Sequence, residues 1–357
     1  MVPRLKKKLR SRKSGLPPGA LVHIGDIKTT TPTLTLIDYS PDGFSERELP
    51  DVAALDALPR GGGVRWLNLH GVHDAELLAA VGQRFGLHPL VIEDVLNTDQ
   101  RPKVDDYDDY LFIVLHLYDI GRNRGDVTTD QISLVVGRDF VLTFQERPSG
   151  TFAPIRQRLR AEKGLLRRTG SDYLAYSLLD AIVDSYFSVI ERLSERAEGL
   201  EEEILGKPQP STLQGIHVLK REVIRLRRTL WPLRETLNTL CRGDAGFFRP
   251  ETQLYLRDVY DHTVHVLESL EDVRDLLNGL LDVYLTTLSN RVNMEVRTLT
   301  VVATLFMPAT LIAGIFGMNF HFIPWLDQPL GFWQALSLMA GVGAVMTAVF
   351  WYRRLLR

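Results

Sequence analysis

The chain has 357 residues, of which 45% are hydrophobic and 24% charged, so it is long enough for two or three structural units. Its formal net charge of −2 excludes a bulk electrostatic attraction to nucleic acid, and we expect no nucleic-acid partner. The single cysteine, Cys241, cannot form a disulfide within the chain, which favours a reducing compartment for most of the protein.

Residues 1–30 are expected to form a basic tail and a linker. Lysine and arginine dominate residues 1–14, and a Gly-Leu-Pro-Pro-Gly sequence follows them. Such a tail favours the cytoplasmic side of a membrane and contact with anionic lipid, although the sequence leaves its role open.

Residues 31–150 mix strand and helix patterns and predict a cytoplasmic α/β domain. Helical spacing of apolar residues marks 74–85, and His88-Pro89 begins a shorter helix that ends at Leu96. The runs rich in Val, Ile, Phe and Thr that predict strands are Thr33–Tyr39, Val64–His70, Tyr110–Tyr118, Ile132–Val136 and Phe140–Gln145.

Residues 151–250 predict cytoplasmic helices only. We expect them at 152–166, at 172–205 before Gly-Lys-Pro, and from an N-cap at Ser211 to about Leu240. From 251 to 316 the chain contains no proline before Pro308, which predicts one long stalk helix that continues into an apolar segment. A helix of this length spans roughly 100 Å and needs partners along it.

Two segments without charged side chains predict a helical hairpin in a membrane. They are Leu299–Phe316, of 18 residues, and Leu330–Tyr352, of 23 residues. A bilayer core of roughly 30 Å needs about 20 apolar residues in a helix. The first transmembrane helix is therefore expected to end at 316, with an external loop at 317–329 and the second helix at 330–352.

The distribution of charge predicts the orientation of this hairpin. Residues 317–329 contain no Lys or Arg, whereas the end of the chain at 353–357 is basic. The positive-inside rule then places both termini in the cytoplasm of a multi-pass protein of the cell (inner) membrane. We therefore expect an α+β multi-domain membrane protein with a cytoplasmic α/β domain, a long helical stalk and two transmembrane helices per subunit.

Two membrane helices cannot enclose a water-filled path, so conduction would require several copies around an axis. The second apolar helix is apolar around most of its circumference and suits contact with lipid. The first has a face of small, polar or soft residues at helical spacing, which predicts either a pore lining or close helix packing. The residues on this face are Asn293, Leu299, Ala303, Met307, Thr310 and Gly314.

Gly317-Met318-Asn319 follows the first apolar helix directly and resembles the signature of the CorA family of magnesium transport proteins. The preceding sequence from Ala303 to Phe316 also resembles that family. Further similar patches lie in the family's order over most of the chain, at His88–Asp94, Gln100–Lys103, Trp231–Glu235 and Tyr255–Thr263.

The resemblance implies a homopentameric funnel in which the stalk helix lines the pore and Gly317-Met318-Asn319 forms the outer mouth. The implied activity is channel-like influx of Mg²⁺, with Co²⁺ and Ni²⁺ as further candidate ions. A ring of Asn319 amides suits Mg²⁺, because this ion gives up its water reluctantly and the amide oxygens accept hydrogen bonds from the bound waters. A C-cap of the first helix is the plainer role for Asn319.

The resemblance also implies regulation by cytoplasmic Mg²⁺. Acidic residues that match Asp94 and Asp258 meet across the subunit interface in the family, and Glu93 with Asp180 match a second site. Bound cations would neutralise these carboxylates and hold the ring closed until cytoplasmic Mg²⁺ falls. Solvated helix faces are the plainer interpretation of such carboxylates.

Several alternatives stay open at this point. His321 stands where relatives commonly carry acidic residues, so the sequence does not fix the preferred ion among Mg²⁺, Co²⁺, Ni²⁺ and Zn²⁺. It also does not fix whether transport is passive or coupled to protons. A zinc-transporting relative and a non-conducting helical scaffold are the rival functions, and Met318 argues against the zinc branch. We expect no enzymatic activity, because the sequence offers no nucleophile constellation and no glycine-rich phosphate loop.

Overall fold

The computed structural model describes residues 15, 17–58, 62–120, 127–162, 164–206, 208–243, 246–318, 325 and 328–353. The chain divides into two compact units. The first comprises Met1–Gly199 and Gly215–Leu277, and the second comprises Leu200–Gln214 and Asn278–Arg357.

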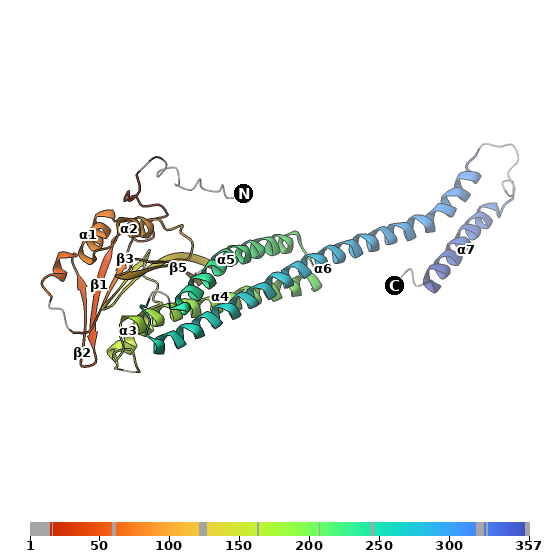
Figure 1. Ribbon diagram of the computed structural model, residues 1–357. Coiled ribbons are helices and arrows are strands. Elements are labelled where there is room, and N and C mark those ends of the chain that lie inside the picture. The colour runs from red at the N-terminus through yellow and green to blue at the C-terminus, as the bar shows by residue number, and fades with distance from the viewer. Residues whose placement is uncertain are drawn as a thin grey trace. The chain divides into compact units, whose positions relative to one another are not determined.

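The first unit contains a sheet of seven strands in the order β2-β1-β3-β7-β6-β5-β4 (Figure 1). Neighbouring strands pair antiparallel except β3 and β7, which pair parallel. The strands are β1 Thr33–Ser40, β2 Gly43–Leu49, β3 Val64–His70, β4 Lys103–Asp106, β5 Tyr110–Ile120, β6 Val127–Gly137 and β7 Phe140–Gln145.

The sequence predicts β3 and β7 with the bounds that the structure has, and it misses β2 and β4. Both missed strands lie at the edges of the sheet, where only one side of the backbone is paired. The sequence of β2, Gly-Phe-Ser-Glu-Arg-Glu-Leu, carries three charged residues and has a buried side chain only at Leu49. Charged residues are common on edge strands, so composition alone does not identify such a strand.

The helices α1 (Ala75–Phe85) and α2 (Pro89–Leu96) cover one face of the sheet, as Figure 1 shows. Asp74 caps α1 by accepting hydrogen bonds from two backbone N–H groups, and the His88 ring caps α2 in the same way. Apolar side chains of both helices form one core with side chains from six strands. α2 carries Glu93 and Asp94, two of the carboxylates that the sequence predicts as regulatory metal ligands.

Helices follow on the other side of the sheet. α3 is Ala153–Arg160, which is shorter than the predicted helix over 152–166. The chain turns after Arg160 because Glu162 has a left-handed backbone, with φ of 54°. The first residue before α3, Phe152, is buried with its ring 6.1 Å from that of Trp66 on β3.

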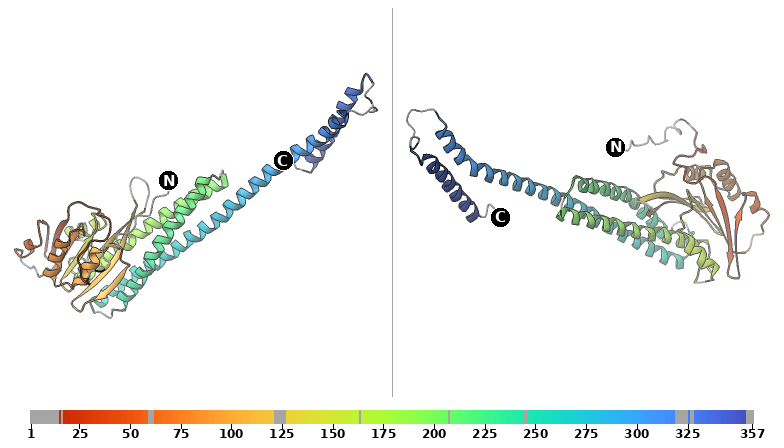
Figure 2. Two further views of the ribbon diagram at one scale, coloured as in Figure 1. Left: turned by 90° about the horizontal axis from the view of Figure 1, so that it is seen from above. Right: turned by 180° about the vertical axis from the view of Figure 1, so that it is seen from behind.

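Long helices follow: α4 (Ser171–Gly206), α5 (Pro210–Arg242) and α6 (Pro250–Phe316). Most of α4, most of α5 and the part of α6 before Asn278 belong to the first unit. In both views of Figure 2, α4, α5 and the first part of α6 run side by side within this unit. The predicted N-cap at Ser211 is wrong, because the helix begins one residue earlier at Pro210. Proline has no backbone N–H to leave unpaired, so it suits a first helical position.

The second unit consists mainly of the later part of α6 and of α7 (Gly331–Tyr352). The predicted helix of more than sixty residues is present, since α6 has 67 residues. Among the described residues, three helices are long and apolar enough to cross a membrane. The protein itself buries 61% of the apolar window of α4, against 6% for α6 and 6% for α7. Packing in the protein core therefore explains the apolar residues of α4.

Candidate metal centre

An ion pair between a buried carboxylate and an exposed arginine fixes α4 and α6 together at their starts. Asp172, on the first turn of α4, accepts hydrogen bonds from Arg249 Nη2 at 2.8 Å and Nε at 3.0 Å, and from Thr252 Oγ1 at 2.7 Å. Burial alone would raise the pKa of the Asp172 carboxyl, but these donors outweigh it and its pKa is lowered. Because both helices leave this point in the same direction, residues one to three turns further along them face each other.

Two turns along α4, the side chains of Asp180 and Asp184 meet His262 of α6. One potential ligand atom from each residue lies within 4.8 Å of the other two. The carboxylates are four residues apart, so they share one face of α4. The ring of Phe187 lies edge-on to the His262 ring at 5.9 Å. The arrangement places two carboxylates and one imidazole around one point.

The two carboxylates repel each other in this position. Burial is the largest cause that raises the pKa of Asp180, to about 6, and the nearby charge of Asp184 is the next. Asp258 raises it further, while His262 and Arg158 lower it. A divalent cation would relieve this repulsion, and the cluster is therefore a candidate metal centre.

The ligand set also indicates which ions fit. Mg²⁺ prefers oxygen ligands and keeps several waters, so two carboxylates are sufficient for it. An imidazole adds affinity for Co²⁺, Ni²⁺ or Zn²⁺. The His262 Nδ1 atom is buried without a hydrogen-bond partner among the described residues. The ligand types therefore fit hard cations through the carboxylates and softer ones through His262.

The sequence predicts Asp180 and Asp258 as metal ligands but misses Asp184 and His262. Asp258 is exposed and lies beside the centre, with its Oδ2 atom 3.8 Å from His262 Nε2. A signal for the missed residues is present in the sequence, since Asp180–Asp184 and Asp258–His262 both have a spacing of four. That spacing places each pair on one helix face, but it does not reveal that the two faces meet.

Glu93 and Asp94 are not members of this group of three. The Asp94 carboxylate lies 2.7 Å from Lys103 Nζ and also accepts a hydrogen bond from the Gln100 side chain. Glu93 accepts a hydrogen bond from the backbone N–H of Gly19. Within one chain, therefore, Asp94 is held by a cation of the protein itself, and a metal ion would have to compete with Lys103.

The predicted pore face lies on the later part of α6. Leu299 and Met307 are 69% and 68% exposed, and Asn293 is also exposed. A shallow groove of about 650 Å³ runs along this helix, and its lining includes Ala303, Met307, Thr310, Gly314 and Met318. Gly317 follows the last residue of α6, while Asn319 and His321 lie outside the described residues.

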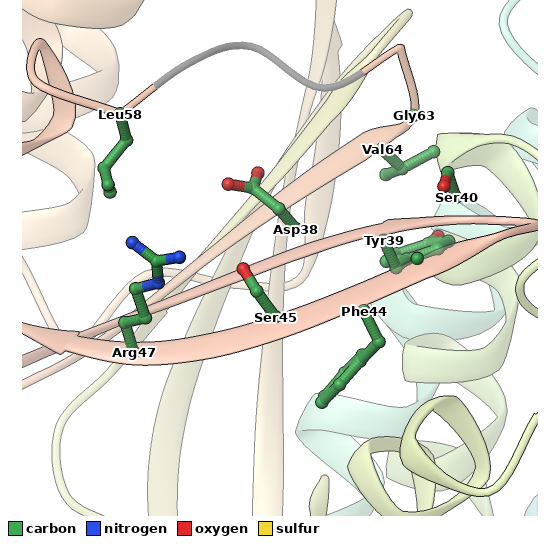
Figure 3. Close-up of a pocket in the computed structure, with 10 residues that line it drawn as sticks. Asp38, Tyr39, Ser40, Phe44, Ser45, Arg47, Leu58, Gly63 and Val64 are labelled. Atoms are coloured by element: carbon green, nitrogen blue, oxygen red, sulfur yellow. The ribbon is translucent and has the colours of Figure 1, made fainter.

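Another cavity, of about 280 Å³, lies at the edge of the sheet beside the β1–β2 hairpin (Figure 3). Its acidic side chain, Asp38, forms an ion pair of 2.8 Å with Arg65. Ser40, Ser45 and Arg47 supply the other polar groups drawn in Figure 3. A single carboxylate that is already paired is a poor cation site, so this cavity is not part of the metal centre.

An α/β domain with attached long helices, two of them with uncovered apolar surface, indicates a membrane protein. Residues 61–354 match the model of a protein family described as "CorA-like Mg2+ transporter protein". The chain belongs to this CorA-like family.

The comparisons with individual proteins agree with this assignment. The chain is 41% identical to a cobalt/magnesium transport protein CorA of Thermotoga maritima, over 97% of this chain and 98% of the relative. It is 35% identical to a putative metal ion transporter of Bacillus subtilis, over 80% of this chain and 88% of the relative. The solved structure of a CorA magnesium transporter from Methanocaldococcus jannaschii has a similar fold, with a TM-score of 0.76 and 21% identity, covering 90% and 98% of the two chains.

Proposed function

We propose that this protein is a channel-like transporter that mediates influx of Mg²⁺, with Co²⁺ and Ni²⁺ as further substrates. The observation that carries this proposal is the match to the CorA-like Mg²⁺ transporter family over residues 61–354. The Thermotoga relative that transports cobalt and magnesium by name supports the choice of ions. The protein is then a transporter and not an enzyme.

The pore is proposed to form between several copies of α6, five in the homopentamer that the family resemblance implies. The apolar windows of α6 and α7 are 6% buried in one chain, so they need lipid or other copies to cover them. α6 and α7 are proposed to cross the cell membrane as the two transmembrane helices, with both termini in the cytoplasm. The α6 face of Ala303, Met307, Thr310 and Gly314 would line the axis.

Selection is proposed to occur at the mouth, where Gly317, Met318 and a ring of Asn319 amides would bind the hydrated ion. Amide oxygens accept hydrogen bonds from coordinated water without removing it, which suits an ion that dehydrates slowly. Uncharged ligands also let the ion leave again, since a ring of carboxylates would bind it more tightly.

Cytoplasmic Mg²⁺ is proposed to close the pore by feedback. One set of sites would lie between subunits and include Asp94 and Asp258, with Glu93 and Asp180 at a second. Burial and, next, the charge of Asp184 raise the pKa of Asp180, which supports this idea, because a cation there stabilises the state that brings the carboxylates together. Since Asp258 and the pore face both lie on α6, a single helix connects sensor and gate.

Ion flux into liposomes that contain the purified full-length protein tests the transport function. We expect Mg²⁺ flux, and we expect Asn319→Ala to abolish it while the oligomer still assembles. Asn278→Ala, an exposed asparagine of α6 outside the pore face, is the matched control and should conduct normally. Absence of flux for Mg²⁺, Co²⁺, Ni²⁺ and Zn²⁺ in an assembled oligomer would favour a scaffold without transport activity.

The zinc-transporting alternative predicts a different result in the same liposomes. A proton gradient should then drive Zn²⁺ uptake and leave Mg²⁺ uptake small. Met318 in the signature argues against this alternative. Equal Mg²⁺ flux with and without the proton gradient would identify passive Mg²⁺ transport.

Limited proteolysis tests the regulatory sites separately. Mg²⁺ should protect the wild-type protein from cleavage. Asp258→Lys should reduce the additional protection that Mg²⁺ gives, because the lysine ammonium takes the place of the cation. Asp272→Lys on the same helix, an exposed position outside the metal centre, is the control and should keep it. Full protection of Asp258→Lys by Mg²⁺ would remove Asp258 from the sensor.

A further inference from the structure

A large basic pocket lies in the first unit, away from the metal centre. It has a volume of about 880 Å³, which is within the usual range for small-molecule sites. Its walls are the segment 99–102 before β4, the middle of β5 and one turn of α5 on each side of Thr229. The side chains that line it include Asp99, Arg101, His116, Arg227, Arg228 and Trp231.

The charge of this pocket is positive. Three arginines and one aspartate line it. Burial lowers the pKa of His116 to about 4, so that ring is neutral at physiological pH. Arg101 and Arg228 are exposed and form no ion pair with the described residues, whereas Arg227 lies 2.7 Å from Glu271. One guanidinium group can donate two parallel hydrogen bonds to the oxygens of a phosphate. Two arginines at one opening that form no ion pair with the described residues therefore suit a phosphate group.

The pocket also presents an aromatic ring that is already held in place. The indole of Trp231 is 45% exposed. The guanidinium of Arg227 lies 6.0 Å from its centroid and that of Arg234 lies 5.8 Å away, so cations on neighbouring helix turns restrict the ring. A large apolar side chain that is fixed yet exposed inside a polar pocket is suited to stacking against a planar base.

The lining of the pocket also includes polar groups that a ligand can reach. The Nδ1 atom of His116 is buried and has no hydrogen-bond partner in the described part of the chain. Thr229 is held by a hydrogen bond of 2.7 Å with Tyr118, which keeps α5 against β5. Asp99 is the single carboxylate of the lining and can accept a hydrogen bond from a sugar hydroxyl.

We propose that this pocket binds a nucleotide, with Arg101 and Arg228 on its phosphates, Trp231 against its base and Asp99 near its ribose. The proposal concerns binding only and does not depend on transport. Inorganic polyphosphate shares the charge of the ligand but lacks the base, and a nucleoside shares the base but lacks the charge. Comparison of the two separates a nucleotide site from a general anion site.

Equilibrium binding of radiolabelled ATP to the full-length protein in detergent tests the proposal. A metal-free buffer prevents ATP from reaching the protein through a bound cation. We expect saturable binding of one ATP per subunit, with inorganic triphosphate and adenosine each competing at least about tenfold more weakly. Arg101→Gln with Arg228→Gln, and separately Trp231→Leu, should each weaken ATP binding by about tenfold or more.

Arg221→Gln is the matched control, because Arg221 is an exposed arginine of α5 that does not line the pocket. It should bind ATP as the wild type does. Arg101→Gln alone changes only a loop residue, and it keeps the test valid if the double variant does not fold. The proposal is overturned if the wild type shows no saturable ATP binding or if the arginine variants bind normally. Equal competition by inorganic triphosphate and ATP would overturn the nucleotide assignment.

Discussion

Replacement of Asp184 by asparagine should change the stability of the protein in opposite directions with and without Mg²⁺. Without a cation, Asp184 repels Asp180, which is one reason that the pKa of Asp180 is raised from 3.8 to about 6. Removal of one charge relieves that repulsion. With Mg²⁺ present, the same substitution removes a ligand, so the variant should gain less from the ion than the wild type does.

The size of both effects follows from the site. A shift of about two pKa units corresponds to about 3 kcal/mol at most. Burial is the larger cause of the raised pKa, and water screens the exposed Asp184, so the relief from Asp184→Asn should be about 0.5–1 kcal/mol. Mg²⁺ at about ten times its dissociation constant stabilises an intact site by about 1.4 kcal/mol, and the variant should lose most of that amount.

Thermal unfolding of the full-length protein in detergent, with chelator and with Mg²⁺, measures these changes. Without the ion we expect the variant to melt about 1–3 °C above the wild type, and with the ion we expect it to melt below the wild type. Asp272→Asn, which removes an exposed charge of α6 outside the centre, should show neither effect. If Mg²⁺ raises the melting temperature of Asp184→Asn as much as that of the wild type, the assignment of a metal centre at this position is refuted.

Three further predictions follow from the first unit. Asp172→Asn should lower the free energy of unfolding by about 1–3 kcal/mol in chemical denaturation, because Arg249 loses its carboxylate partner, and equal stability would contradict its anchoring role. The raised pKa of Asp180 means that its ionisation costs stability in the metal-free protein, so the melting temperature should fall as pH rises from about 4 to above 6. The rise in melting temperature on addition of Mg²⁺ should appear over the same pH range, and a rise that does not depend on pH would exclude Asp180 as the titrating group. Gly137→Ala should cost about 1–3 kcal/mol, because its Cβ would overlap the ring of Phe140, and a melting temperature equal to that of the wild type would show that the ring moves freely.

Local sequence patterns predicted much of the fold. β7 is an almost continuous apolar run, β3 has apolar residues at four of its seven positions, and the predicted bounds of both agree with the structure. The length of α6 followed from the absence of proline before Pro308. The edge strands β2 and β4 were missed because a strand paired on one side keeps a charged sequence. Their pairing partners, β1 and β5, decide that they are strands.

The candidate site was predicted only in part, and the reason is distance along the chain. Asp180 and Asp184 are separated by one helix turn, so their proximity is a local property of α4. His262 comes 78 residues after Asp184, and nothing in its neighbours shows which helix it will face. The contact of Asp172 with Arg249 and Thr252 brings the two helices together in one register.

The sequence by itself therefore determined the long helices, the apolar hairpin and the resemblance to the CorA family, because each depends on residues close together in the chain. The tertiary structure decided which distant side chains meet. It joined His262 to the carboxylates of α4, and it held Asp94 against Lys103. It also assembled the basic pocket from Arg101 of a loop, His116 of a strand and the arginines and Trp231 of a helix, because packing sets contacts that sequence spacing does not encode.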